Sequence, residues 1–243
     1  MVKIDSLINI IQEWCSELKE AREIKPVDYR ISIPNELIRL TNILRQQQLL
    51  DMPKHALQNQ HVNGACLLAN RKELLLTLPK NGIVAELGVD NGEFSQKIIE
   101  NCSPQKLYLV DVWDTERYNE TKALDVYKKF SDQIEIGKVE IKRSLSVHAA
   151  KTFDDEVLDW VYIDTDHSYK TTLAELYAYS PKVKKNGFIA GHDYVMGNWG
   201  SSYKYGVIEA VAEFCLKENW CISHLTADYT ENNSFAMIFF HYF

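Results

Sequence analysis

The sequence lacks a long hydrophobic run, a pattern of paired cysteines and any excess of positive charge. No stretch of its 243 residues approaches the roughly 18 consecutive apolar residues of a transmembrane helix. The opening Met-Val-Lys-Ile-Asp-Ser does not lead into the uninterrupted apolar core of a signal peptide. The five cysteines are an odd number without a CxxC pair, which indicates reduced thiols and no zinc site. We therefore expect a cytoplasmic protein with no membrane partner.

The charge of the chain is acidic and unevenly placed. The 27 Lys and Arg residues against 34 Asp and Glu residues give a formal net charge of −7. Residues 1–75 carry a net charge of +1, and residues 76–243 carry −8. Because an acidic protein is repelled by nucleic-acid phosphates and by anionic lipid, we expect no nucleic acid among its partners. A composition of 46% hydrophobic and 25% charged residues is typical of a globular protein.

Residues 1–79 are predicted to form an N-terminal helical extension. Apolar side chains recur there with the spacing of an amphipathic helix, whereas residues 51–70 are polar and suggest a loop or a short helix. The expected helices cover residues 4–18, the segment from near Pro34 to just before Pro53, and residues 70–78 or so. The extension is interpreted as a substrate cover or as an oligomer contact, and the second reading would make the protein a homo-oligomer.

Residues 80–243 alternate short apolar runs with helical stretches, which predicts βαβ units and a parallel sheet. The final two apolar runs are joined by a short polar link, which predicts a terminal antiparallel hairpin. The fold class is therefore α/β, with a Rossmann-like, doubly wound, mostly parallel sheet of seven strands. The expected strands lie at residues 83–87, 107–111, 139–141, 158–164, 187–190, 220–226 and 234–242, with helices near 92–101, 115–131, 144–152, 170–180 and 205–218.

A glycine loop, Glu86-Leu87-Gly88-Val89-Asp90-Asn91-Gly92, follows the first of these strands. Gly88 and Gly92 can take a positive φ and let the backbone approach a ligand, although such glycines also occur in simple turns. The G-x-x-x-G spacing differs from the G-x-G-x-x-G of dinucleotide dehydrogenases. Asp111 ends the second strand, where a carboxylate either caps a helix or accepts hydrogen bonds from ribose hydroxyls. Together these residues favour a cofactor that carries a ribose.

Asp and His residues follow the next two central strands of the predicted sheet. Asp164 and His167 come after one strand, and His192 and Asp193 come directly after the next. Neighbouring parallel strands end at the same edge of a sheet, so these four side chains are expected to converge. Carboxylates with imidazole can hold a divalent ion.

The glycine loop, the acid that closes the second strand and the terminal hairpin resemble a class I S-adenosylmethionine-dependent methyltransferase. The resemblance spans about residues 80–243, and the cationic sulfonium of that cofactor suits an acidic site. It implies that Glu86 and Gly88 face the methionine part of the cofactor. By the same resemblance Asp111 faces the ribose, and Trp113 lies near the adenine together with Arg143-Ser144-Leu145. The implied cofactor-binding residues are Glu86, Gly88, Gly92, Asp111, Trp113, Arg143, Ser144 and Asp164.

The segment Ile163-Asp164-Thr165-Asp166-His167-Ser168-Tyr169 resembles a narrower group, the metal-dependent O-methyltransferases of sugars and macrolides and the cephalosporin hydroxylase-like proteins. This resemblance implies His167 as the catalytic base and Asp164, His192 and Asp193 as metal ligands. His192 departs from the pattern, since an acid is usual there. Imidazole is a softer ligand than carboxylate, so the ion is expected to be Mg²⁺, Mn²⁺ or Zn²⁺, or to be absent.

The predicted function is therefore transfer of a methyl group from S-adenosylmethionine to a hydroxyl oxygen of a small molecule, such as a sugar or a natural-product-like metabolite. A base that takes the hydroxyl proton and an ion that lowers its pKa are suited to this reaction. One alternative is an NAD-dependent oxidoreductase, which the glycine spacing and the terminal hairpin disfavour. Another is a non-catalytic S-adenosylmethionine-binding module, which the complete set of His and Asp residues disfavours.

Overall fold

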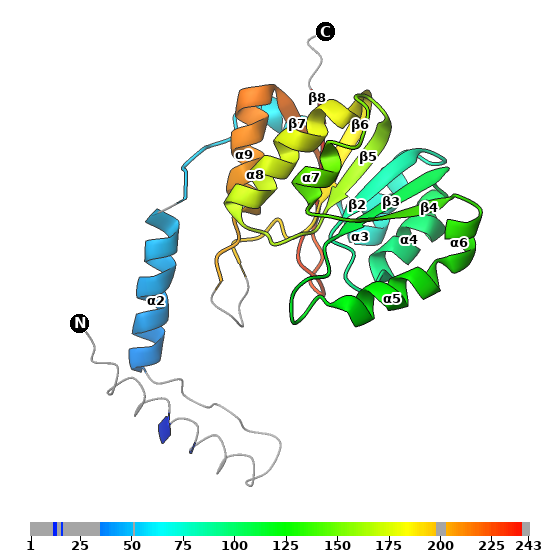
Figure 1. The fold of residues 1–243 in the computed structure, drawn as a ribbon. Helices are drawn as coiled ribbons and strands as arrows, with labels where there is room; N and C mark the ends of the chain where they lie inside the picture. The colour runs from blue at the N-terminus through cyan, green and yellow to red at the C-terminus, as the bar shows by residue number, and fades with distance from the viewer. Residues whose placement is uncertain (1–11, 14–15, 17–34, 51, 198–202, 240–243) are drawn as a thin grey trace. The chain divides into compact units, whose positions relative to one another are not determined.

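The computed structural model of this chain describes residues 12–13, 16, 35–50, 52–197 and 203–239. The chain divides into two compact units, Met1–Asp51 and Met52–Phe243. In the first unit helix α2 covers Asn35–Leu50 (Figure 1), close to the helix predicted between Pro34 and Pro53. The helix predicted over residues 4–18 lies largely outside the described residues. The role of the N-terminal segment as a cover or as an oligomer contact stays a prediction.

The second unit is built on a sheet of eight strands in the order β1-β7-β8-β6-β5-β2-β3-β4. Only β8 runs antiparallel to its neighbours, β6 and β7, and this confirms the predicted mostly parallel α/β fold with a terminal hairpin. The strands are β1 (Cys66–Leu68), β2 (Ile83–Leu87), β3 (Lys106–Asp111), β4 (Val139–Arg143), β5 (Leu158–Ile163), β6 (Val183–Gly191), β7 (Trp220–Thr226) and β8 (Phe235–Phe239).

Strand β1 is the one strand that the seven-strand prediction misses. It has three residues and pairs in parallel with β7 at the edge of the sheet. Three residues are too few to show the alternation by which a strand is recognised from sequence. Its place in the sheet comes from tertiary pairing with a strand more than 150 residues further along the chain.

Helices cover both faces of the sheet (Figure 1). Buried side chains of α7, α8 and α9 pack against one face of the sheet, and buried side chains of α3, α4 and α5 pack against the other face. The helix expected near 115–131 is found at 120–129, and Phe130, which is fully buried, separates it from a further short helix at 131–135. The helices are α3 (Arg71–Thr77), α4 (Glu93–Cys102), α5 (Glu120–Lys129), α6 (Ser131–Glu135), α7 (Ser146–Ala150), α8 (Tyr169–Tyr179) and α9 (Val207–Glu218), with short 3₁₀ turns at Asn59–His61 and Ser180–Lys182.

Residues 52–79 pack with the sheet, so the compact unit begins at Met52 rather than at the predicted boundary after residue 79. Helix α3 buries Leu74 and Leu75 completely in the core. The indole of Trp160 on β5 donates a 3.1 Å hydrogen bond to the carbonyl of Pro79. The amphipathic pattern of α3 is equally consistent with a separate helical layer, which is why sequence periodicity did not place it on the sheet.

The strand order reverses direction beside β2, at the carboxyl ends of β2 and β5. The chain runs from β2 outward through β3 to β4, and then returns to the other side of β2 as β5. Ligands of open α/β sheets bind in the crevice formed by such a reversal. Among the described residues, no helix is long and apolar enough to cross a membrane, and the four described cysteines are free thiols.

Candidate functional site

The glycine loop approaches the end of β5 so closely that residue 88 has to lack a side chain. Gly88 has φ +84°, and a Cβ built on it would lie 1.9 Å from the carbonyl oxygen of Asp164. Its N–H donates a 2.9 Å hydrogen bond to Val110, which ties the loop to β3 as well. At the other end of the loop, Gly92 has φ +72° and precedes the first turn of α4. A left-handed backbone in so little space is available to glycine alone.

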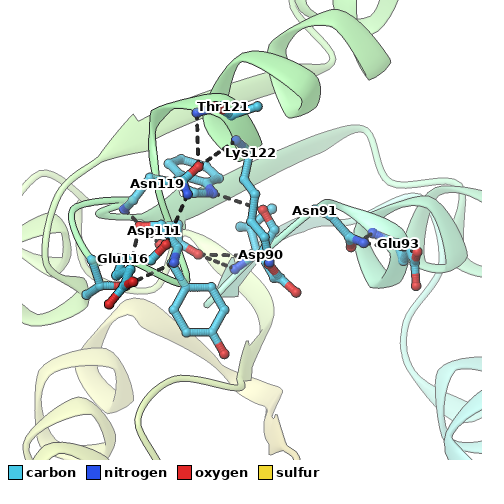
Figure 2. Close-up of polar contacts among 12 residues, drawn as sticks. Asp90, Asn91, Glu93, Asp111, Glu116, Asn119, Thr121 and Lys122 are labelled. Atoms are coloured by element: carbon cyan, nitrogen blue, oxygen red, sulfur yellow. Dashed lines mark hydrogen bonds and ion pairs between the residues drawn. The ribbon is translucent and has the colours of Figure 1, made fainter.

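Asp111 holds the backbone of this loop in place (Figure 2). One carboxylate oxygen, Oδ2, accepts hydrogen bonds from the N–H groups of Val89 at 2.8 Å and Asp90 at 3.1 Å. The other oxygen, Oδ1, accepts one bond from the N–H of Trp113 at 3.1 Å. A carboxylate offers about four acceptor positions, so Asp111 fixes the loop and retains capacity to bind a hydroxyl.

The outer side of the loop is buttressed by the segment that leads into α5 (Figure 2). Lys122 forms an ion pair with Asp90, and Asn119 caps the helix by accepting hydrogen bonds from two of its first N–H groups. The Trp113 indole is 2% exposed and donates a 2.9 Å hydrogen bond to the Asp90 carbonyl. Trp113 therefore packs against the loop, and its predicted contact with adenine stays a prediction.

Arg143 and Ser144, also predicted near adenine, lie at the end of β4 beside Asp111. The N–H of Ser144 donates a 3.1 Å hydrogen bond to the Asp111 carbonyl. Arg143 is exposed and forms an ion pair of 2.8 Å with Glu120 at the start of α5. The structure thus brings Ser144 to the loop, whereas the Arg143 guanidinium is engaged with a surface carboxylate.

Glu86 is buried inside the sheet at the base of the loop. It is 1% exposed, and its Oε2 accepts a 2.5 Å hydrogen bond from the Ser95 hydroxyl on α4. Burial raises the pKa of Glu86 to about 8, although the Ser95 hydrogen bond and the Arg71 charge act to lower it. The carboxyl group is therefore mostly protonated at neutral pH.

Arg71, in the first turn of α3, reaches the same edge of the sheet, and no motif in the sequence marks it. Its Nη2 donates a 2.5 Å hydrogen bond to Oδ2 of Asp164, and its Nε donates a 2.7 Å bond to the hydroxyl of Tyr162. The guanidinium carbon lies 3.6 Å from the centre of the Phe94 ring, within the range of a cation–π contact. These contacts place a buried positive charge beside the glycine loop.

Asp164 lies between two cationic side chains, Arg71 and His192. Its Oδ1 is 3.7 Å from Nδ1 of His192. Burial acts to raise the pKa of Asp164, but His192 and Arg71 together lower it to about 2. The pKa of His192 rises to about 9, because the carboxylates of Asp164 and Asp193 outweigh the effect of its burial. The carboxylate of Asp164 is therefore ionised at neutral pH.

His167 and Asp193 form the second pair of the site. Nδ1 of His167 is 3.0 Å from Oδ2 of Asp193, whose Oδ1 accepts a 2.6 Å hydrogen bond from Asn232. Both residues have a positive φ, +60° for His167 and +57° for Asp193. Such conformations are uncommon outside glycine and concentrate at functional sites.

Three of the four predicted Asp and His residues form one cluster of donor atoms. Asp164, His167 and Asp193 each place one ligand atom so that the three atoms lie within 4.8 Å of one another. The resemblance implied His192, rather than His167, as the third ligand. His192 lies beside the cluster, with Nδ1 3.6 Å from Asp193, and its buried Nε2 has no hydrogen-bond partner. The spacing of residues in sequence did not distinguish these two imidazoles.

Comparison with known proteins agrees with this geometry. Residues 85–194 match a protein family described as a methyltransferase domain, and they contain the glycine loop, Asp111 and the Asp/His cluster. No curated protein matches the chain.

Several solved methyltransferase structures are similar in fold. An rRNA methylase from Streptococcus thermophilus is 14% identical, with 70% of this chain and 94% of that chain covered at a TM-score of 0.50. An S-adenosylmethionine-dependent methyltransferase from Aquifex aeolicus is also 14% identical, with 79% and 97% covered at 0.50. The m1A22 tRNA methyltransferase TrmK of B. subtilis is 9% identical, with 71% and 67% covered at 0.52. At these identities the likeness supports the fold alone. The match over residues 85–194 supports a methyltransferase domain in this chain.

Proposed function

We propose that this methyltransferase acts on a hydroxyl oxygen of a small molecule and that His167 is the base. The observation that carries this proposal is the His167–Asp193 pair, with 3.0 Å between Nδ1 and Oδ2. A carboxylate on one ring nitrogen of a histidine orients the ring and fixes its tautomer, which leaves the other nitrogen to accept a proton. The pair lies at the sheet edge that also carries the glycine loop.

The reaction asks the chain to hold two reactants in line and to remove one proton. The hydroxyl oxygen attacks the methyl carbon, the carbon–sulfur bond breaks, and the hydroxyl proton passes to Nε2 of His167. Placing nucleophile, methyl carbon and sulfur in line can supply about 7–11 kcal/mol of the barrier. A positioned base adds a further factor of about 10²–10⁴ in rate.

The cofactor is proposed to bind along the glycine loop. Gly88 and Gly92 allow close approach of the backbone, and Asp111 has acceptor capacity for a ribose hydroxyl. Asp164 supplies a carboxylate for the cationic methionine part, and Glu86 supplies a protonated, uncharged carboxyl group at the base of the loop. Trp113, Arg143 and Ser144 are proposed near the adenine because they surround Asp111.

A divalent ion is proposed at the Asp/His cluster. Two carboxylates and one imidazole within 4.8 Å are a donor set that suits Mg²⁺, Mn²⁺ or Zn²⁺. Asp164 and Asp193 would hold the ion, with His192 beside them, and His167, the third member of the cluster, would stay unligated as the base. When bound, such an ion lowers the pKa of a hydroxyl next to it. The hydrogen bond from Arg71 to Oδ2 of Asp164 leaves Oδ1 as the available oxygen.

Methyl transfer with His167→Ala and His167→Gln tests the proposed base. Both variants should bind S-adenosylmethionine as the wild type does and lose at least about a hundredfold in kcat on a small-molecule hydroxyl acceptor. A variant that retains full turnover would remove His167 as the base. Adding EDTA, followed by Mg²⁺, Mn²⁺ or Zn²⁺, tests the ion independently, since activity that is unchanged by chelation would rule the ion out.

A further inference from the structure

The segment of residues 203–206, which leads into α9, packs against His167. The centre of the Tyr205 ring lies 4.8 Å from the centre of the His167 ring, and the two planes are inclined by 49°. The N–H of Gly206 donates a 2.8 Å hydrogen bond to the carbonyl of His167. The segment therefore contacts both the side chain and the backbone of the proposed base.

The turn that carries His167 fits this segment without spare room. A Cβ built on Gly206 would lie 2.2 Å from the backbone nitrogen of Tyr169, so a side chain cannot be accommodated there. Helix α8 begins at Tyr169, and the side chain of Ser168 caps its first turn. The left-handed backbone of His167, with φ +60°, is thus bounded by the start of α8 and by residue 206.

The 203–206 segment is itself anchored at several points. Tyr205 is 7% exposed, and its N–H donates a 3.3 Å hydrogen bond to the carbonyl of Met196, in the loop after β6. The buried ammonium of Lys204 donates hydrogen bonds of 2.7 and 2.9 Å to the two carboxylate oxygens of Glu209 on α9. A buried ring on an anchored backbone has little freedom to move, so it can restrict a ring that it touches.

The imidazole of His167 is bounded by two side chains of different kinds. Asp193 lies 3.0 Å from Nδ1, and an ionic contact at one atom still allows the ring to turn about that atom. The Tyr205 ring lies within the range of aromatic packing and limits this turning. The His167 side chain remains 21% exposed, so these contacts orient the ring without enclosing it.

We infer that Tyr205 is a positioning residue for His167 and that its ring keeps the imidazole in one orientation relative to Asp193. The inference rests on the proposed function, because this orientation matters for catalysis only if His167 is the base. It assigns the effect to the aromatic ring of Tyr205 and not to its hydroxyl.

NMR of the His167 ring signals, assigned with His167→Gln, tests the ring contact without an acceptor. We expect a nuclear Overhauser effect between the two rings in the wild type. Tyr205→Phe keeps an aromatic ring and should leave the His167 signals close to those of the wild type. Tyr205→Leu should shift and broaden them, because the imidazole gains a second orientation. The control Tyr127→Leu, which removes an exposed ring on α5, should leave them unchanged.

Absence of the Overhauser effect, or His167 signals that do not move in folded Tyr205→Leu, would overturn the inference. The Overhauser effect is measured on the wild type, so it decides the question even if circular dichroism shows that Tyr205→Leu does not fold.

Methyl transfer, with the acceptor that is used for His167→Gln, tests the consequence for catalysis. A misplaced group can cost about a hundredfold in rate, so we expect Tyr205→Leu to lower kcat at least about tenfold. Its Kd for S-adenosylmethionine should stay that of the wild type, and Tyr205→Phe should restore most of the lost kcat. Residues that act as a unit have non-additive effects, so Tyr205→Leu/His167→Gln should be no slower than His167→Gln alone.

A double variant that is markedly slower than His167→Gln would mean that Tyr205 acts independently of His167. A Tyr205→Phe variant as slow as Tyr205→Leu would assign the effect to the hydroxyl. Either result overturns the inference. Full turnover by His167→Gln would instead contradict the proposed function and leave the NMR result on the ring contact standing, so the two failures are distinguishable.

Discussion

The guanidinium of Arg71 lies 2.5 Å from the carboxylate of Asp164, measured from Nη2 to Oδ2. The pair joins the first turn of α3 to the residue after β5, 93 positions further along the chain. The side chains are 11% and 23% exposed, so the pair is largely removed from water, and His192 is a second cation beside Asp164. This contact makes α3 part of the site as well as part of the core.

Replacing Arg71 should therefore destabilise the fold. Removing one partner of a buried ion pair costs about 3–5 kcal/mol, and the lower end of this range applies here because His192 remains beside Asp164. We expect Arg71→Ala to lower the free energy of unfolding by about 3 kcal/mol in urea titrations, and Arg71→Lys to lower it by less. The double variant Arg71→Ala/Asp164→Asn should recover part of the loss, since it also removes the stranded carboxylate. A single variant within about 0.5 kcal/mol of the wild type would contradict this role.

Gly88→Ala should disrupt the site through steric overlap, and the chain offers a matched control. Gly64 has φ +83°, nearly the value of Gly88, but a Cβ there meets nothing within 4 Å. Gly64→Ala should cost about 1–2 kcal/mol of stability through the left-handed backbone alone. Gly88→Ala adds a collision with Asp164, so we expect a larger loss by about 1–3 kcal/mol or more. If Gly88→Ala and Gly64→Ala lost the same stability in thermal or urea unfolding, the contact between residue 88 and Asp164 would impose no steric cost.

Glu86→Gln should alter how stability depends on pH. The pKa of Glu86 rises from 4.5 to about 8 on folding, so the native state retains a proton that the unfolded state releases. The contribution of Glu86 to the free energy of unfolding is complete below about pH 4.5. It falls by up to about 1.4 kcal/mol per pH unit as the pH approaches 8. Glutamine has no proton to lose, so the variant's stability should fall less steeply between pH 5 and 8. Parallel curves for the two proteins would contradict the raised pKa.

Asp193→Asn should slow catalysis while leaving the cofactor affinity unchanged. Asparagine tolerates the positive φ of this position but removes the charge that faces His167. We expect kcat to fall by at least about tenfold, with the Kd for S-adenosylmethionine within twofold of the wild type. If kcat were unchanged, the His167–Asp193 pair would have no part in the reaction.

The backbone of the site could be predicted from sequence, whereas its side-chain partners could not. The pattern of apolar residues along the chain predicted strands β2 to β8 to within a few residues. The spacing of the glycines, together with Asp111, predicted the loop and the strand end that supports it. These features are local in sequence, so their patterns are visible there. Strand β1 was missed because three residues carry no period.

Arg71, Glu231 and Asn232 were missed for a different reason. Each reaches the site from an element distant in sequence, and only the packing of α3 and of the β7–β8 loop brings them to Asp164 and Asp193. The same holds for the choice between His167 and His192. Both follow a strand end closely, and no signal in the sequence shows that His167, which has a left-handed backbone, is the imidazole that joins the cluster.

Isothermal titration of S-adenosylmethionine into the wild-type chain tests the central claim most directly. We expect saturable binding at one site per chain with a Kd well below millimolar, and binding at least tenfold weaker for Gly88→Ala than for the folded Gly64→Ala control. Absence of binding up to millimolar cofactor, with the protein shown by circular dichroism to be folded, would contradict it.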